Sequence, residues 1–184
     1  MAEQLFDKHK QMITAKNLFI AGKHGVGKTT LIREVVMPFR ERAGGFYTEE
    51  IRDSNGLRGF RIKTFDGREG ILAHKGMKSA VKLNKYGIDP VVLDTVGVAA
   101  VCAALREKDV VVIDEIGSID IVSDSFRAVL MEVIRSPKKV LATVRLNAQP
   151  FTDEIKRMPD TAMLMLSRDK FTDVKQQVTG WIKL

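Results

Sequence analysis

The sequence predicts an α/β fold, a three-layer sandwich in which a mainly parallel sheet lies between two layers of helices. Short aliphatic runs alternate with amphipathic segments along most of the chain. Parallel strands need crossover connections, which are usually helices, so this alternation favours a sheet covered on both faces. A glycine-rich segment after the first aliphatic run and an acidic pair at the end of a later one lie where ligands bind such sheets.

Length and composition predict one globular domain over residues 1–184. The chain is 45% hydrophobic and long enough to bury a core that needs no disulfide or metal staple. Its single cysteine, Cys102, excludes a disulfide scaffold and a cysteine-based zinc site. No apolar run approaches the roughly 20 residues of a membrane-spanning helix, so we expect a cytoplasmic protein with no membrane partner.

The charge balance does not by itself predict a nucleic-acid partner. Lys and Arg number 30 and Asp and Glu number 23, which gives a formal net charge of +7. Acidic and basic residues are interspersed, however, and no block of five basic residues occurs. We therefore expect no specific binding to nucleic acid.

The first elements follow the alternating pattern. Residues 3–13 place their apolar side chains near one helical face and predict an N-terminal helical extension within residues 1–16. The apolar run at 17–21 predicts a buried strand. A helix should begin near Lys28 and end around Pro38, since proline and the following glycine pair interrupt helices.

The segment 45–73 breaks this alternation. The stretches FYTEEI and FRIKTF alternate apolar and polar residues, and the sequence DSNGLRG between them contains an Asn-Gly turn signal. This pattern predicts an antiparallel hairpin insertion, with another strand at 71–73. Residues 75–90 are polar and punctuated by glycine, and we expect them to form a loop.

The remaining chain returns to helices and strands. Residues 91–107 predict a helix with Gly97 as a weak point in its middle. The four aliphatic residues at 110–113 predict a central strand. The other expected elements are a helix at 124–136, a strand at 140–144, a short helix at 150–158, a strand at 162–166 and a terminal helix at 171–182.

Residues 22–29, GKHGVGKT, fit the phosphate-binding loop pattern G-x-x-x-x-G-K-[ST]. The segment follows a predicted strand and opens a predicted helix, which is the context that phosphate binding requires. Lys28 would reach the β- and γ-phosphates, and the Thr29 hydroxyl would ligate Mg²⁺. The expected nucleotide-binding residues are Gly22, Lys23, His24, Gly25, Val26, Gly27, Lys28, Thr29 and Thr30.

The acidic pair ends the run VVVIDEIG at residues 110–117. An aspartate after such a strand holds Mg²⁺ in phosphate-loop proteins, usually through water, and Asp114 fits that role. The adjacent Glu115 could orient and deprotonate an attacking water. This adjacency indicates a P-loop NTPase (Rossmann-like) fold of the branch with an additional strand and a catalytic glutamate.

Chemistry at the γ-phosphate also calls for additional positive charge, which an arginine can supply. Arg145 follows a predicted strand, where residues that sense the γ-phosphate often lie. Arg52 is a second candidate, although it could simply pair with the nearby Glu49-Glu50. The full set of candidates is Arg52, Arg58, Arg61, Arg145 and Arg168.

Four segments together resemble one family. GKHGVGKTT, GGFYTEEIR, LRGFRIKTFDGREGILA and VVVIDEIGSID are similar to the small P-loop nucleoside-triphosphatases, also called cancer-related nucleoside-triphosphatases, over about residues 16–183. The resemblance implies a single α/β domain and Mg²⁺-dependent hydrolysis of nucleoside triphosphates (ATP, GTP, CTP and UTP) with low base selectivity. It implies the usual roles for Lys28, Thr29, Asp114 and Glu115, and it matches Arg52 to a hairpin arginine of the family. We expect a monomer.

Two other functions stay open at this point. A kinase would transfer the γ-phosphate to a small molecule or nucleotide, and segment 75–90 with the hairpin could form its acceptor pocket, but no arginine-rich lid is apparent. A nucleotide-dependent switch would use the basic charge and the N-terminal helix for docking, with slow hydrolysis resetting its state. No N-K-x-D segment is present, which argues against a GTP-specific switch.

Overall fold

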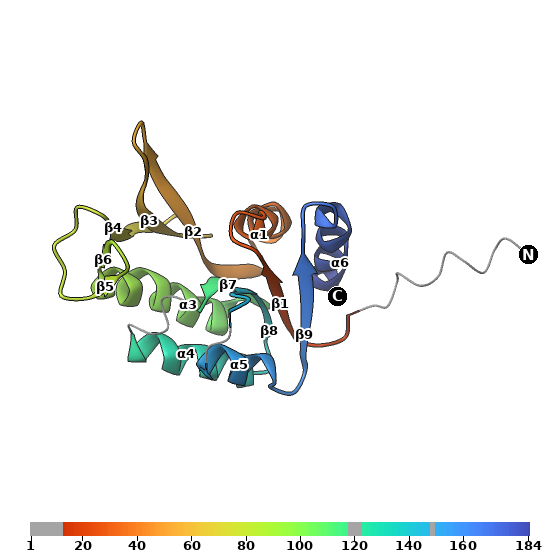
Figure 1. Ribbon diagram of the computed structural model, residues 1–184. Helices are drawn as coiled ribbons and strands as arrows, with labels where there is room; N and C mark the ends of the chain where they lie inside the picture. Colours follow the sequence, from red (N-terminus) through yellow and green to blue (C-terminus); the bar gives the residue numbers. More distant parts are fainter. Residues whose placement is uncertain (1–12, 118–122, 148–149) are drawn as a thin grey trace, which may run out of the picture.

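A nine-stranded mixed sheet organises the protein (Figure 1). The computed structural model describes residues 13–117, 123–147 and 150–184, and the helix expected at 3–13 falls, apart from its last residue, outside them. The strand order is β5 (Lys82–Leu83), β6 (Tyr86–Ile88), β4 (Glu69–His74), β3 (Gly56–Thr64), β2, β7, β8, β1 and β9. The parallel part comprises β2 (Ala43–Asp53), β7 (Val110–Ile116), β8 (Lys139–Val144), β1 (Asn17–Gly22) and β9 (Thr161–Leu166).

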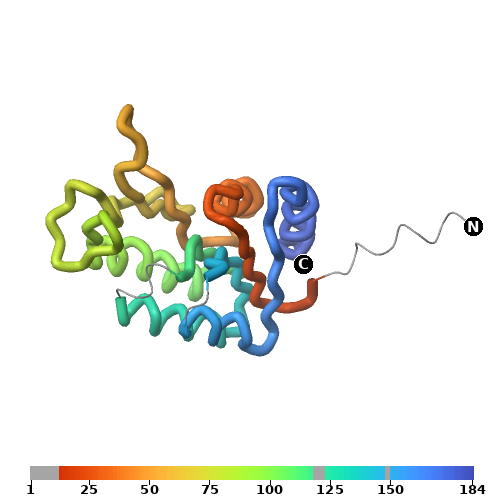
Figure 2. Tube along the Cα trace, viewed as in Figure 1, coloured from red at the N-terminus to blue at the C-terminus, as the bar shows by residue number. Residues whose placement is uncertain are grey.

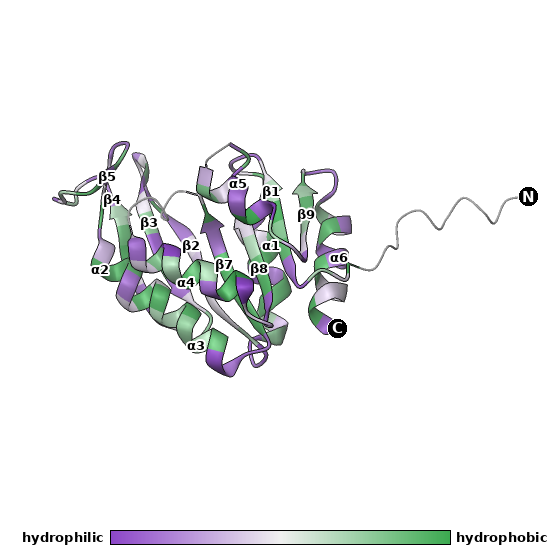
Figure 3. Cartoon of the chain, turned by 90° about the horizontal axis from the view of Figure 1, so that it is seen from below, coloured by the Kyte–Doolittle hydropathy of each residue, from purple (hydrophilic) through white to green (hydrophobic). Residues whose placement is uncertain are grey.

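Helices cover both faces of the parallel part, which gives the three layers that the sequence predicts (Figures 1 and 2). One face carries α1 (Lys28–Val36) and α6 (Phe171–Lys183), and the short 3₁₀ turn η1 (Met37–Phe39) extends α1. The other face carries α3 (Ala99–Glu107), α4 (Asp124–Arg135) and α5 (Pro150–Lys156). Figure 3 views the molecule from the side of α3 and α4, with the sheet behind them.

Two hydrophobic clusters, one on each face, hold the layers together. The first contains Phe19, Phe46 and Phe126 under α3, α4 and α5, and the second contains Leu18 and Ile20 under α1 and α6. Successive residues of β1 therefore point to opposite cores, and every residue of this strand is buried. A central parallel strand reads as a continuous apolar run for this reason.

Strand β2 joins the parallel and antiparallel halves of the sheet. Its first residues, Ala43–Phe46, pair parallel with β7, and Phe46–Asp53 pair antiparallel with β3 (Gly56–Thr64). At Gly45 the backbone adopts a φ of 116°, and a Cβ there would lie 2.1 Å from the Val112 carbonyl oxygen. The expected hairpin is present, and β4 (Glu69–His74) continues it, so these strands extend the main sheet.

The expectation that residues 75–90 form only a loop was wrong. They contain β5 (Lys82–Leu83) and β6 (Tyr86–Ile88), which pair with each other, and β6 also pairs with β4. Strands of two and three residues are too short to show an alternating pattern, so pairing with β4 decides this structure. The rings of Phe60 and Tyr86 also meet edge to face, 5.4 Å apart, and pack β6 onto β3.

The helix expected at 91–107 is present but irregular. It consists of α2 (Pro90–Val92), a π-helical turn η2 (Leu93–Val98) and α3. Asp89 caps its start by accepting hydrogen bonds from the amides of Val91 and Val92. Gly97 lies in the π-helical turn, where a Cβ would be 2.8 Å from Ile62 Cδ1. The glycine thus permits close packing of η2 on β3.

The other predicted helices and strands are confirmed, and most ends differ by one or two residues. The strand expected at 110–113 continues three residues further, to Ile116, as β7. Trp181 is buried and donates a hydrogen bond from Nε1 to the Ala15 carbonyl oxygen at 2.7 Å. Phe46 and Tyr47 are likewise core residues. Each helix within 13–117, 123–147 and 150–184 is too short or too polar to cross a lipid bilayer.

Candidate active site

The glycine-rich loop connects the carboxyl end of β1 to the first turn of α1. Gly25 and Gly27 have φ values of 71° and 103°. Residues with a side chain rarely adopt such positive φ values, so glycine is favoured at both positions. Gly22 ends β1, and a Cβ there would lie 2.7 Å from the Leu166 carbonyl oxygen of β9. Lys28 begins α1, whose N-terminal amides favour an anion. The loop therefore has the backbone form of a phosphate cradle.

Asp114 lies at the carboxyl end of β7 with 1% of its surface exposed. Its carboxylate accepts hydrogen bonds from the Thr29 hydroxyl at 2.7 Å and from the Thr143 hydroxyl on the neighbouring strand β8. The Thr48 amide of β2 also donates to it, at 3.4 Å. Four elements thus converge on one carboxylate.

Burial raises the pKa of Asp114 above its ordinary value, because an apolar surrounding disfavours the charged form. The hydrogen bonds from Thr143 and Thr29 oppose this shift, since they favour the carboxylate. A buried carboxylate with few compensating charges is a strong attractor for a cation.

Glu115 lies between two cationic side chains. Its Oε2 is 3.0 Å from Lys28 Nζ, and its Oε1 is 3.0 Å from Arg145 Nε. The Lys28 ammonium also donates to the Gly22 carbonyl oxygen at 3.2 Å. The side chains of Lys28 and Glu115 are only 10% and 22% exposed, so water screens this pair poorly. The lysine of the loop and the glutamate of the acidic pair are therefore direct neighbours.

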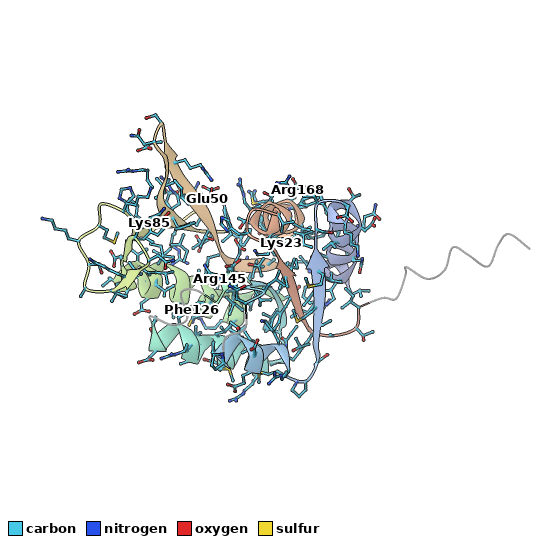
Figure 4. The ribbon with its side chains drawn as sticks, viewed as in Figure 1. Lys23, Glu50, Lys85, Phe126, Arg145 and Arg168 are labelled. Atoms are coloured by element: carbon cyan, nitrogen blue, oxygen red, sulfur yellow. The ribbon has the colours of Figure 1, made fainter. Side chains whose placement is uncertain are left out.

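The other arginine candidates lie away from this group. Arg52 is 61% exposed and pairs with Glu50 at 2.7 Å. Arg58 and Arg61 pair with carboxylates of the hairpin. Arg168 precedes α6, on the flank of the loop opposite to Arg145 (Figure 4).

A cavity of about 420 Å³ opens beside the loop. Of the predicted nucleotide-binding residues, His24, Gly25, Gly27, Lys28, Thr29 and Thr30 line it, whereas Gly22, Lys23 and Val26 do not. In the view of Figure 4, Glu50 and Arg145 lie between Lys23 of the loop and Lys85 of the β5–β6 turn. The rest of the polar lining is Arg33, Thr48, Glu49, Glu50, Glu115 and Arg145, and the apolar lining is Phe60, Leu72, Ala73, Leu83 and Ile88.

Comparison with known proteins identifies the family. The NTPase family matches residues 17–179 of the chain. The chain belongs to this NTPase family. The match includes the glycine-rich loop, the acidic pair and every strand of the sheet.

Several relatives of this NTPase carry the name Nucleoside-triphosphatase THEP1. The protein from Thermotoga sp. (strain RQ2) is 37% identical over 166 residues, which is 90% of this chain and 95% of that protein. The Thermotoga petrophila protein is 42% identical over 166 residues, covering 90% and 92% of the two chains.

Solved structures share the fold. The crystal structure of THEP1 from Aquifex aeolicus superposes with a TM-score of 0.81 at 30% identity, covering 88% of this NTPase and 96% of that chain. The solution structure of a human cancer-related nucleoside triphosphatase gives a TM-score of 0.77 at 24% identity, covering 92% and 98%. The nine-stranded α/β architecture is therefore a P-loop NTPase fold.

Three residues of this candidate site were not predicted from the sequence. Thr143 and Thr48 donate to Asp114, and Arg33 of α1 lines the cavity. Thr143 carries a recognisable signal, since it is a polar residue within the apolar run of the strand at 140–144. Thr48 and Arg33 carry none, because only the folding of β2 over α1 brings them to the cavity.

The oxygen donors at this site fit a magnesium ion. Mg²⁺ takes hard oxygen ligands, keeps several waters and is held by one or two carboxylates plus substrate phosphates. Thr29 Oγ1 and the Asp114 carboxylate meet these needs, 2.7 Å apart next to the glycine-rich loop. Among the described residues there is no cluster of three or more His, Cys, Asp or Glu side chains that could hold a metal by themselves.

Proposed function

We propose that this NTPase hydrolyses nucleoside triphosphates to the diphosphate and phosphate, with Mg²⁺ and with low selectivity for the base. The observation that carries the proposal is the position of Glu115. It contacts the Lys28 ammonium of the phosphate loop directly, and so lies where a terminal phosphate would sit. A carboxylate at that point can accept a proton from water.

Phosphate binding would exchange the partners of Lys28. The γ-phosphate oxygens replace Glu115 on Lys28 Nζ, and Glu115 keeps its bond to Arg145, which is 3.0 Å away. Glu115 is then free to orient a water in line with the leaving oxygen and to take its proton. Lys28, Arg145 and the loop amides stabilise the charge that develops on the phosphoryl oxygens.

Thr29 and Asp114 would hold the magnesium ion, Thr29 directly and Asp114 through water. When bound, the ion neutralises charge on the β- and γ-phosphates. Through their hydrogen bonds, Thr143 and Thr48 orient the Asp114 carboxylate and favour its charged form. We place the charge-stabilising role on Arg145 in preference to Arg52, because Arg52 does not line the cavity.

We further propose that the protein is of the additional-strand, catalytic-glutamate type and forms one domain. The supporting observation is the strand order, in which β8 lies between β1 with its phosphate loop and β7 with its acidic pair. The same strand β8 leads into Arg145, beside Glu115. All nine strands described belong to one sheet, which supports a single folding unit.

The test is phosphate release from ATP, GTP, CTP and UTP with Mg²⁺, compared in wild type and Glu115→Gln. We expect release from several nucleotides, reduced roughly a hundredfold or more in the variant, as is typical when a general base is removed. Nucleotide affinity, measured by calorimetry, should persist in the variant because the loop and Lys28 are intact. Full turnover in Glu115→Gln would refute the role of this carboxylate.

A further inference from the structure

The cavity extends beyond what a triphosphate requires. At about 420 Å³ it falls in the size range of sites for small organic molecules. Its polar side carries the phosphate loop, Glu115 and Arg145, and its far side is apolar. Phe60, Leu72, Ala73, Leu83 and Ile88 come from four strands, β3, β4, β5 and β6, that lie outside the parallel part of the sheet.

The apolar side lies beyond the terminal phosphate. Lys28, Thr29 and Glu115 mark the γ end of the triphosphate, and from there the cavity runs toward β3 and β4, away from β1. The opposite flank of the loop is bordered by α6, where Phe171 lies 3.3 Å from the Cβ position of Gly27. A nucleoside attached at the other end of the triphosphate would extend toward this α6 flank.

The rim of the cavity favours an uncharged occupant. Glu49 pairs with Arg33 and with Lys63, each at 3.1 Å. Glu50 pairs with Arg52 at 2.7 Å. Both carboxylates are therefore already neutralised by the protein. Leu72 and Ile88 form the inner wall and are each only 2% exposed, whereas Phe60 and Leu83 are partly exposed, and all four side chains are apolar.

We propose that the apolar half of this cavity binds the organic part of a small alcohol, whose hydroxyl accepts the γ-phosphoryl group in competition with water. The hydroxyl oxygen forms a bond to the γ-phosphorus, and the bond from that phosphorus to the β–γ bridging oxygen breaks. The nucleoside diphosphate leaves with the electron pair. The hydroxyl proton passes to Glu115 and then to solvent. The proposal rests on the proposed function for its phosphoryl donor and its base.

The experiment measures how products divide between two acceptors. The protein is incubated with Mg-ATP and equal concentrations of ethanol, n-butanol or n-hexanol, and ³¹P NMR quantifies alkyl phosphate and inorganic phosphate. If the cavity buries the alkyl chain, each added methylene should raise the ratio of alkyl phosphate to inorganic phosphate about fourfold. Phosphate without any alkyl phosphate, or a ratio independent of chain length, would overturn the acceptor site. Absence of both products would instead contradict the proposed hydrolysis.

Matched variants on one strand locate the site. Ala73→Leu adds volume inside the cavity, whereas Ile71→Phe adds volume at a residue that is 48% exposed and does not line it. We expect Ala73→Leu to remove the chain-length dependence and Ile71→Phe to retain it. Leu83→Phe, at the partly buried rim, provides a second occlusion if Ala73→Leu does not fold. A dependence that survives both occluding variants would overturn the assignment.

Nucleotide affinity separates the alcohol from a nucleobase as the occupant. The dissociation constant of Mg-ADP, measured by calorimetry, should agree within about twofold between the Ile71→Phe and occluded variants, since the nucleoside lies on the other flank. Loss of ADP binding on occlusion, with the fold intact by circular dichroism, would show that the cavity holds the base and would refute the proposal.

Discussion

Replacing Thr143 with valine probes the hydrogen bonds that support Asp114. Thr143 is fully buried on β8, and its hydroxyl donates to the carboxylate of Asp114, which is itself 1% exposed. Valine has nearly the same shape and removes only the donor. The carboxylate then keeps the Thr29 hydroxyl at 2.7 Å and the weaker Thr48 amide at 3.4 Å.

The expected cost in unfolding free energy is about 1.5–3 kcal/mol at neutral pH, the usual contribution of a hydrogen bond to a charged group. This cost in free energy depends on pH. Burial raises the pKa of Asp114 in the folded protein, so Asp114 stabilises the fold fully only below its unfolded-state pKa, near 3.8. That stabilisation is lost as pH rises through the folded-state pKa. The hydrogen bond from Thr143 lowers the folded-state pKa of Asp114, so loss of this bond in Thr143→Val raises that pKa further. The destabilisation should therefore be greater at pH 8 than at pH 5.

Urea unfolding followed by circular dichroism, with a chelator present, measures the effect. Thr143→Ser is the control, because it keeps the hydroxyl and loses only a methyl group, at about 1 kcal/mol. The slope of free energy against urea should be the same for all three proteins. If Thr143→Val is as stable as Thr143→Ser at both pH values, the carboxylate does not depend on this bond.

Three further predictions test other parts of the site and fold. Lys28→Ala should raise the Kd of ATP roughly 10- to 100-fold by calorimetry, as expected for lost charge-assisted bonds, and an unchanged Kd would contradict the phosphate loop. Arg145→Ala should lower kcat by roughly 10³-fold while the exposed Arg52→Ala changes it little, and the reverse order would move the role to Arg52. Gly45→Ala should cost about 3 kcal/mol or more in urea unfolding, because its Cβ would lie 2.1 Å from a carbonyl oxygen. Gly56→Ala, with a φ of 94° and nothing within 4 Å, should cost only about 1–2 kcal/mol.

Local signals account for the predictions that the structure confirms. Strand β1 is a continuous apolar run, and helix α4 is long enough to show its helical period. The Asn55-Gly56 turn signal lies at the β2–β3 turn, with Asn55 in the turn and Gly56 opening β3 opposite Asp53. The β5–β6 pair went unpredicted because strands this short carry no period. The π-helical turn around Gly97 also went unpredicted, since it depends on close packing against Ile62.

Three features could be predicted from the sequence alone: the alternation of strands and helices, the glycine-rich loop at 22–29 and the acidic pair at 114–115. Each of these features depends on residues that are consecutive in the chain, so hydrophobic periodicity and short motifs are enough to predict it. The position of Glu115 between Lys28 and Arg145, and the hydrogen bond from Thr143 to Asp114, depend on how the chain folds in space. So does the apolar cavity beside the loop, which four antiparallel strands line. These contacts join residues far apart in the chain, and strand order and register bring them together, which no local pattern encodes.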